Sequence, residues 1–309
     1  CGETGGPSRE GSSQRGMVGL KYAQPSRPSM DTRFRRLAVV TTGLTYVLVL
    51  LGLYTGATAG GLSCEARWPL CDGAVFGLFP ANWASFFEWS HRFVAMVVGV
   101  LLLGTLYGAW RWQDDRRIAW AVTGAIVLLP LQVGLGAVTT TAGGIFPGGF
   151  NPVVMVTHFS TAAIIFSLLV VGTLLAVAPP TRDRLRHLLA GMGVFAVLHA
   201  VFDVTGLVPF YPNYQVVFYG ASYALLAGFL AFGTWAFLSA ARPVTRHAGM
   251  TSLVGALVVV VDMILSRRLL GVNELVAYGT TALVVLAVLG VAWLQTQAGS
   301  AERASPAAE

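Results

Sequence analysis

Two histidines in apolar stretches of this sequence could carry chemistry that needs an imidazole inside a membrane. His91 follows Glu88 by three residues, at the start of the apolar run Phe93–Trp110. On a helix the two side chains share one face. A charged group costs roughly 2.5–3.5 kcal/mol at mid-bilayer, so this pair indicates either a function or a position near the headgroups. His158 lies in another apolar run, and two facing histidines are a common way to hold a heme iron.

The two histidines are expected at similar depths in the membrane. Asn82 is a good N-cap for the helix that carries His91, and Asn151-Pro152 is a strong start for the helix that carries His158. At 1.5 Å per residue, the histidines lie roughly 13 Å and roughly 10 Å along these helices. Either one alone is more typical of an interhelical hydrogen bond. The matched pair beside a carboxylate favours ligation of one iron.

Glu88 has three interpretations that the sequence leaves open. It could act as a general acid or base, it could orient His91, or it could be an interfacial carboxylate that water solvates. Ala95 and Gly99 continue the same helix face beyond the histidine. These small residues would let a flat macrocycle lie close to the helix.

Two cysteines lie in the connection before Glu88. Cys64 and Cys71 enclose residues 65–70, in a polar segment expected on the outer side of the membrane. Disulfides persist there, and closing so small a ring stabilises the fold by roughly 2–3 kcal/mol. Zinc needs more ligands than this connection offers. A disulfide with a structural or a redox role is therefore favoured over two buried thiols.

The stretch Gln132–Gly136 favours a packing interpretation. Gln132 is expected to donate a hydrogen bond between helices, and Gly134 and Gly136 are expected to permit close helix approach.

The second half of the chain holds further polar residues in apolar runs. His199 and Asp203 stand one turn apart, and Asp262 lies in a later run. An intramembrane Asp–His pair is a candidate secondary polar site, and a transporter with a midplane site could use all three residues. Alternatively, Asp203 simply reaches the membrane interface. His187 and His247 lie among arginines and are expected on the surface.

The composition predicts an all-α integral membrane protein. Of 309 residues, 55% are hydrophobic and only 11% are charged, whereas soluble domains carry about 25% charged residues. The net charge of +6 comes from arginines near helix ends, so it indicates membrane topology and not nucleic-acid binding. Eight transmembrane helices are predicted, each near the roughly 20 residues that a span needs. The apolar runs are about Leu37–Ala57, Trp89–Trp110, Ile118–Val138, Val153–Ala178, Leu188–Leu207, Val216–Leu238, Met250–Leu265 and Leu275–Leu294.

The arginines predict the orientation of these helices. They gather before the first run and in alternate connections, whereas the connections at 139–151 and 208–215 hold none. Arg67 lies on the other side, and Arg267 and Arg268, before the last run, break the rule. Both termini are therefore expected in the cytoplasm, in a multi-pass protein of the cell membrane. The helices divide into two four-helix bundles between tails. The expected parts are a disordered N-terminal tail at 1–36, a heme-binding half at 37–180, a C-terminal half at 181–296 and a disordered tail at 297–309.

Together, these motifs resemble heme A synthases. The resemblance is carried by Gly60–Cys64, Trp68–Gly73, Glu88–Arg92, Gln132–Gly136 and His158, in this order. It covers about residues 37–178, the first four helices. The paired-cysteine loop followed by Glu-x-x-His-Arg is its most specific part.

The resemblance implies an enzyme that oxidises a methyl group of heme O to the formyl group of heme A, for heme-copper terminal oxidases. It implies that His91 and His158 are the axial ligands of the heme iron. Glu88 would match the family's essential glutamate, and Cys64 and Cys71 its external disulfide. A heme O synthase would supply the substrate, an electron acceptor would complete the reaction, and a homo-oligomer is compatible with the pattern. The alternative is a non-catalytic membrane heme carrier or oxidase-assembly factor.

The second half departs from the family pattern. In the family, a second histidine pair from the sixth and eighth helices holds a heme b. The runs Val216–Leu238 and Leu275–Leu294 contain no histidine, and His199 lies in the fifth. A second heme is therefore not predicted here. Either this half is a degenerate scaffold, or His199 has another role.

Overall fold

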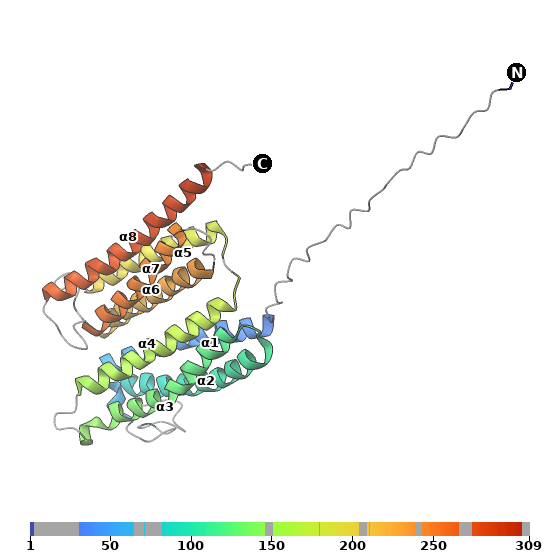
Figure 1. Cartoon of the computed structure of the whole chain (residues 1–309). Helices are drawn as coiled ribbons and strands as arrows, with labels where there is room; N and C mark the ends of the chain where they lie inside the picture. Colours follow the sequence, from blue (N-terminus) through green and yellow to red (C-terminus); the bar gives the residue numbers. More distant parts are fainter. Residues whose placement is uncertain are drawn as a thin grey trace.

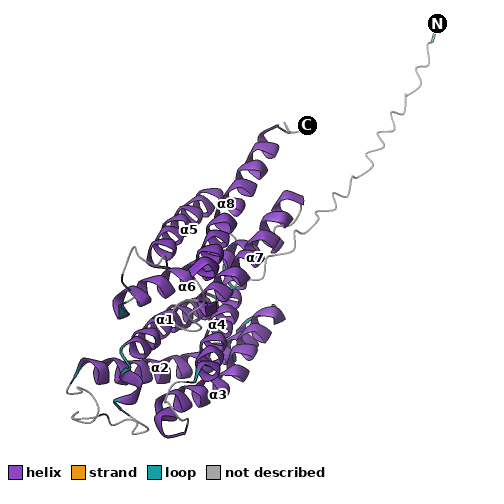
Figure 2. Ribbon diagram, turned by 90° about the vertical axis from the view of Figure 1, so that its left-hand side faces the viewer, coloured by secondary structure: helices purple, strands orange, loops and turns teal. Residues whose placement is uncertain are grey.

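The computed structural model describes residues 1–2, 31–64, 71, 82–145, 151–178, 180–203, 209, 211–238, 243–265 and 274–304. Within these ranges the regular secondary structure is helical, without a strand (Figure 2). The helices are α1 Thr32–Ala57, the short 3-10 helix η1 Gly60–Leu62, α2 Trp83–Trp112, α3 Arg116–Ile145, α4 Pro152–Leu175, α5 Arg182–Asp203, α6 Pro212–Leu238, α7 Pro243–Leu265 and α8 Glu274–Ala304.

The eight α-helices are suited to a membrane. Each contains a stretch long and apolar enough to cross a bilayer. Their outward faces are apolar too: Val127 on α3 is 69% exposed, and Leu289 on α8 is 59% exposed. Such faces are expected where the solvent is lipid. Over the described residues, the prediction of an all-helical chain with eight helices long and apolar enough to span a membrane is confirmed.

Side-chain caps fix the start of three helices. Asp31 accepts hydrogen bonds from the backbone of Arg33 and Phe34, so α1 begins five residues before the apolar run that marks it. Asn82 accepts from Ser85 N, and Asn151 accepts from the first turn of α4. Both asparagine caps were predicted and are confirmed. At the other end of the chain, α8 continues to Ala304, past residue 296, because hydropathy marks the span and not the helix end.

The helices form two groups of four (Figure 1). In the first group, α1 and α3 each pack on both α2 and α4, whereas the described parts of α2 and α4 do not touch each other. In the second group, α5 and α7 each pack on both α6 and α8. Helix α6 also packs on α1 and α4, and so joins the groups. Consequently, α2 and α4 lie diagonally opposite each other across the first bundle.

The packed core fills only part of the first bundle. One buried cluster lies at the starts of α1 and α3 and the ends of α2 and α4, and includes Phe34, Leu102, Ile118 and Leu169. The opposite ends of these helices lie on the side of the membrane that carries Cys64 and Cys71, here called the disulfide side. Of the α3 residues from 126 to 139, none is buried. The interior on the disulfide side is therefore less completely packed.

Candidate functional site

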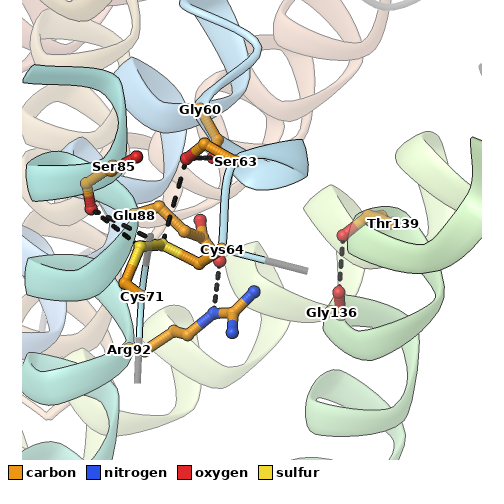
Figure 3. A network of polar contacts seen from close by, with 9 residues as sticks. All are labelled: Gly60, Ser63, Cys64, Cys71, Ser85, Glu88, Arg92, Gly136 and Thr139. Atoms are coloured by element: carbon orange, nitrogen blue, oxygen red, sulfur yellow. Dashed lines mark hydrogen bonds and ion pairs between the residues drawn. A yellow bond between two sulfur atoms is a disulfide. The ribbon is translucent and has the colours of Figure 1, made fainter. Parts of the chain in front are cut away.

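A disulfide lies over the first turn of α2 (Figure 3). Cys64 and Cys71 are bonded, with their Cα atoms 4.6 Å apart. Both sulfur atoms lie near the backbone oxygen of Ser85, at 3.7 and 3.8 Å. The predicted pairing is confirmed, and it ties the loop to the helix that carries Glu88 and His91. Trp68, Pro69, Leu70, Asp72 and Gly73 of the same motif lie outside the described residues.

The turn before the disulfide requires a glycine. Ala59 adopts a left-handed conformation with φ of 55°. A Cβ atom at the next residue, Gly60, would lie 2.7 Å from the backbone oxygen of Ala84. Gly60 therefore lets the chain after α1 approach the start of α2 closely, which explains why a glycine stands at this point of the motif.

Glu88 is buried and paired with Arg92. The Glu88 side chain is 3% exposed, and its Oε1 accepts a hydrogen bond from Nε of Arg92, one turn later. Figure 3 shows Ser85, Glu88 and Arg92 beside the disulfide. The interpretation of Glu88 as a water-solvated interfacial carboxylate is wrong, because packing around the first turns of α2 removes it from solvent.

His91 is held by α1. Its Nδ1 lies 3.2 Å from the backbone oxygen of Leu48, so Nδ1–H donates and Nε2 is left without a proton. A Cβ atom at Gly52 would lie 2.8 Å from Cε1 of His91. The orientation of His91 thus comes from a carbonyl and a glycine of α1, and not from Glu88. Leu48 and Gly52 lie in an apolar run that gives no sequence signal for this role, so the support of His91 was not predicted.

His158 is held by α3. Its Nε2 lies 3.3 Å from Nε2 of Gln132, which confirms Gln132 as an interhelical partner. The Nδ1 atom of His158 is buried without a hydrogen-bond partner among the described residues. A Cβ atom at Gly136 would lie 3.4 Å from Cε1 of the ring. Gly136 therefore makes room for an imidazole, whereas Gly134 is exposed with no described atom within 4 Å, so the expected close approach there is wrong.

The two imidazoles reach the same part of the bundle from opposite helices. They project from α2 and α4, whose described parts do not touch each other. Each ring rests against a glycine, Nδ1 of His91 faces the carbonyl oxygen of Leu48, and Nε2 of His158 faces the amide of Gln132. Together with the incomplete packing on the disulfide side, this donor set fits a heme between α2 and α4.

The secondary polar site is rearranged relative to the prediction. His199 contacts Asp262 of α7, at 3.2 Å between Nε2 and Oδ2, and Ser222 of α6. Asp203 accepts a hydrogen bond from Thr281 of α8. Asp203 is the last residue of α5 and is 1% exposed, so it is buried against α8 at the end of its helix. The partners come from other helices, which sequence spacing cannot reveal.

The surface histidines are where they were expected. His187 and His247 are both exposed, although they lie within the first turns of α5 and α7 and not in connections.

The chain is similar to proteins named heme A synthase. The chain is 27% identical to a heme A synthase of Bacillus licheniformis over 195 residues, which is 62% of this chain and 59% of that protein. It is 31% identical to a heme A synthase of Bacillus pumilus over 194 residues, with the same coverage. A protein of Halobacterium salinarum named protoheme IX farnesyltransferase is 35% identical over 136 residues, 44% of this chain and 28% of that protein. No protein-family model matches the chain.

The matched chain spans about three fifths of the length of the heme A synthases. The matches are longer than the stretch 37–178 on which the motifs lie. The resemblance predicted from those motifs is confirmed: over 62% of its length, this chain is a homologue of heme A synthases.

Proposed function

We propose that the protein is a heme A synthase, which oxidises a methyl group of heme O to the formyl group of heme A. One observation carries this proposal. His91 and His158 project from diagonal helices into the less packed end of one bundle, next to the buried Glu88. The homology to heme A synthases supports the same reading.

The substrate would be held by the two histidines. The carbonyl oxygen of Leu48 keeps the proton of His91 on Nδ1, which leaves Nε2 as the metal-binding nitrogen. Gln132 contacts Nε2 of His158 and would yield that atom to iron. Bound heme supplies the redox chemistry, and the protein supplies position and electrostatics.

Glu88 is the proposed proton acceptor. Oxidation of a methyl carbon releases protons at each stage, and a carboxylate one turn from His91 is placed to take them. Arg92 fixes the carboxylate by its hydrogen bond. The disulfide anchors the first turn of α2 and so fixes where Glu88 stands.

The arginine pattern supports a location in the cell membrane, with both termini in the cytoplasm. The disulfide side then faces the oxidising exterior, where a disulfide persists. Heme O would come from a heme O synthase, and the product would serve heme-copper oxidases. An electron acceptor outside this chain completes the reaction.

The test is pigment analysis of the full-length protein co-expressed with a supply of heme O. We expect extracted heme with a formyl group from the wild type. We expect no bound heme from His91→Ala or His158→Ala, while His247→Ala, an exposed histidine, behaves as the wild type. Wild type without formyl product, under conditions in which a known synthase makes it, contradicts the proposal.

Glu88→Ala separates the enzyme from a heme carrier. If the protein is an enzyme, Glu88→Ala should keep bound heme, because His91 and His158 remain, and it should lose the formyl product. A carrier should bind heme with or without Glu88 and make no product in either form.

A further inference from the structure

Three polar side chains from three helices meet inside the second bundle. His199 on α5 is 0% exposed, Ser222 on α6 is 0% exposed and Asp262 on α7 is 2% exposed. Nδ1 of His199 lies 2.8 Å from Oγ of Ser222, and its Nε2 lies 3.2 Å from Oδ2 of Asp262. Phe218 stacks on the imidazole, with ring centroids 4.9 Å apart. Both nitrogens and one ring face of His199 are thus engaged by protein.

The serine determines where one proton of His199 lies. Oγ of Ser222 donates its only proton to the backbone oxygen of Phe218, at 2.7 Å. The same oxygen can therefore only accept from His199, because a hydroxyl has one proton and two lone pairs. Nδ1 of His199 must therefore carry a proton. Whether Nε2 also carries one depends on its contact with Asp262.

The contact with Asp262 requires a second proton. Neither Nε2 of His199 nor Oδ2 of Asp262 makes a hydrogen bond of normal geometry to any described residue. A bare nitrogen facing a carboxylate oxygen at 3.2 Å would place two lone pairs against each other. A proton on either atom, giving an imidazolium with a carboxylate or a neutral imidazole with a carboxylic acid, removes that repulsion.

The surroundings favour one proton between Nε2 of His199 and Oδ2 of Asp262. An isolated buried charge is very costly, whereas a pair that holds one proton has no net charge in either arrangement. The buried cluster of this bundle is apolar and aromatic, and it includes Phe218, which stacks on His199, and Met263, which follows Asp262. The other titratable groups of the packed helices near the cluster are Asp203 on α5, which accepts from Thr281, Tyr219 and Tyr223 on α6, and Tyr278 on α8.

We propose that His199 and Asp262 form a proton-binding site in the interior of the C-terminal half, in which the two side chains share one proton and Ser222 fixes the tautomer. His199 and Asp262 lie toward the disulfide-side ends of α5 and α7, as His91 and His158 do on α2 and α4. The second bundle thus carries a buried proton at the end where the first bundle carries its histidine pair. This assignment does not depend on the proposed enzyme activity.

The proton can be located by magnetic resonance of isotope-labelled histidine nitrogens in the full-length protein. The chain has only five histidines, and His187→Gln and His247→Gln assign the two exposed ones without disturbing the core. We expect Nδ1 of His199 to show the chemical shift of a protonated nitrogen, and Nε2 a shift between those of a bare and a protonated imidazole nitrogen. A His199 ring with a bare Nδ1, or with an Nε2 shift equal to that of a free bare nitrogen, overturns the proposal.

A substitution tests the role of the carboxylate. In Asp262→Leu, which keeps the branched outline of the side chain and removes its oxygens, Nε2 of His199 should shift to the position of a bare imidazole nitrogen while Nδ1 keeps its proton. Ser252→Ala removes another buried hydroxyl of α7 that has no described partner, and should leave both signals unchanged. An Nε2 signal that is the same with and without Asp262 contradicts the shared proton. If Asp262→Leu does not fold, the nitrogen shifts of the wild type decide alone.

Discussion

Gly52 of α1 faces His91 of α2 so closely that a Cβ atom at Gly52 would lie 2.8 Å from Cε1 of the imidazole. Gly52→Ala should therefore push the ring away from its present orientation. Overpacking of this kind costs about 1–3 kcal/mol, which corresponds to roughly a 5- to 150-fold loss of heme affinity if it falls on the ligand. Heme titration of the full-length variant measures this loss.

Gly43 provides the matched control on the same helix. A Cβ atom at Gly43 would meet no described atom within 4 Å. Gly43→Ala should bind heme as the wild type does. It changes helix propensity as much as Gly52→Ala does, but its added methyl group contacts no described atom. Equal affinities for both variants would show that the position of His91 does not limit heme binding.

The buried pair of Glu88 and Arg92 predicts an asymmetric response to substitution. Arg92→Leu leaves a 3% exposed carboxylate without its partner, and should destabilise the fold by about 3 kcal/mol. Glu88→Gln removes the charge itself and leaves an arginine that is 18% exposed, so its cost should be about 1 kcal/mol. The double variant should be more stable than Arg92→Leu alone.

Arg117→Leu is the control for these unfolding measurements. Arg117 pairs with Asp115 where the side chains are 65% and 32% exposed, and its hydrogen bond holds the pKa of Asp115 below the usual range. Loss of an exposed pair should cost less than about 1 kcal/mol. A loss as large as that of Arg92→Leu would argue that burial does not set the cost.

Features that depend on residues close in the sequence could be predicted, whereas features that depend on contacts between helices could not. Asn82 and Asn151 are capping residues that act on the next turn, so they marked the starts of α2 and α4 correctly. The cysteine pair is separated by only seven residues and was also predictable. The support of His91 by Gly52 was not, because it depends on which faces of α1 and α2 meet.

The disulfide is expected to be structural. The double variant Cys64→Ser/Cys71→Ser opens a short loop, which costs about 2–3 kcal/mol by loop entropy. Its melting temperature should fall, while heme binding and formyl product remain. Cys1 is exposed and free, so Cys1→Ser serves as the control. Reductant should lower the melting temperatures of the wild type and of Cys1→Ser. It should not lower the melting temperature of the double variant. Loss of product with bound heme and unchanged melting would indicate a redox role instead.

The hydroxyl of Tyr46 joins the two bundles through a single hydrogen bond. It donates from α1 to the backbone oxygen of Gly220 on α6, at 2.9 Å. Tyr46→Phe keeps the ring and removes the bond, so it should destabilise the fold by about 0.6 kcal/mol and not more than about 1.7 kcal/mol. Tyr107→Phe, at a position that is 62% exposed on α2, should have no measurable effect. A result for Tyr46→Phe equal to that for Tyr107→Phe would mean that packing alone holds α1 against α6.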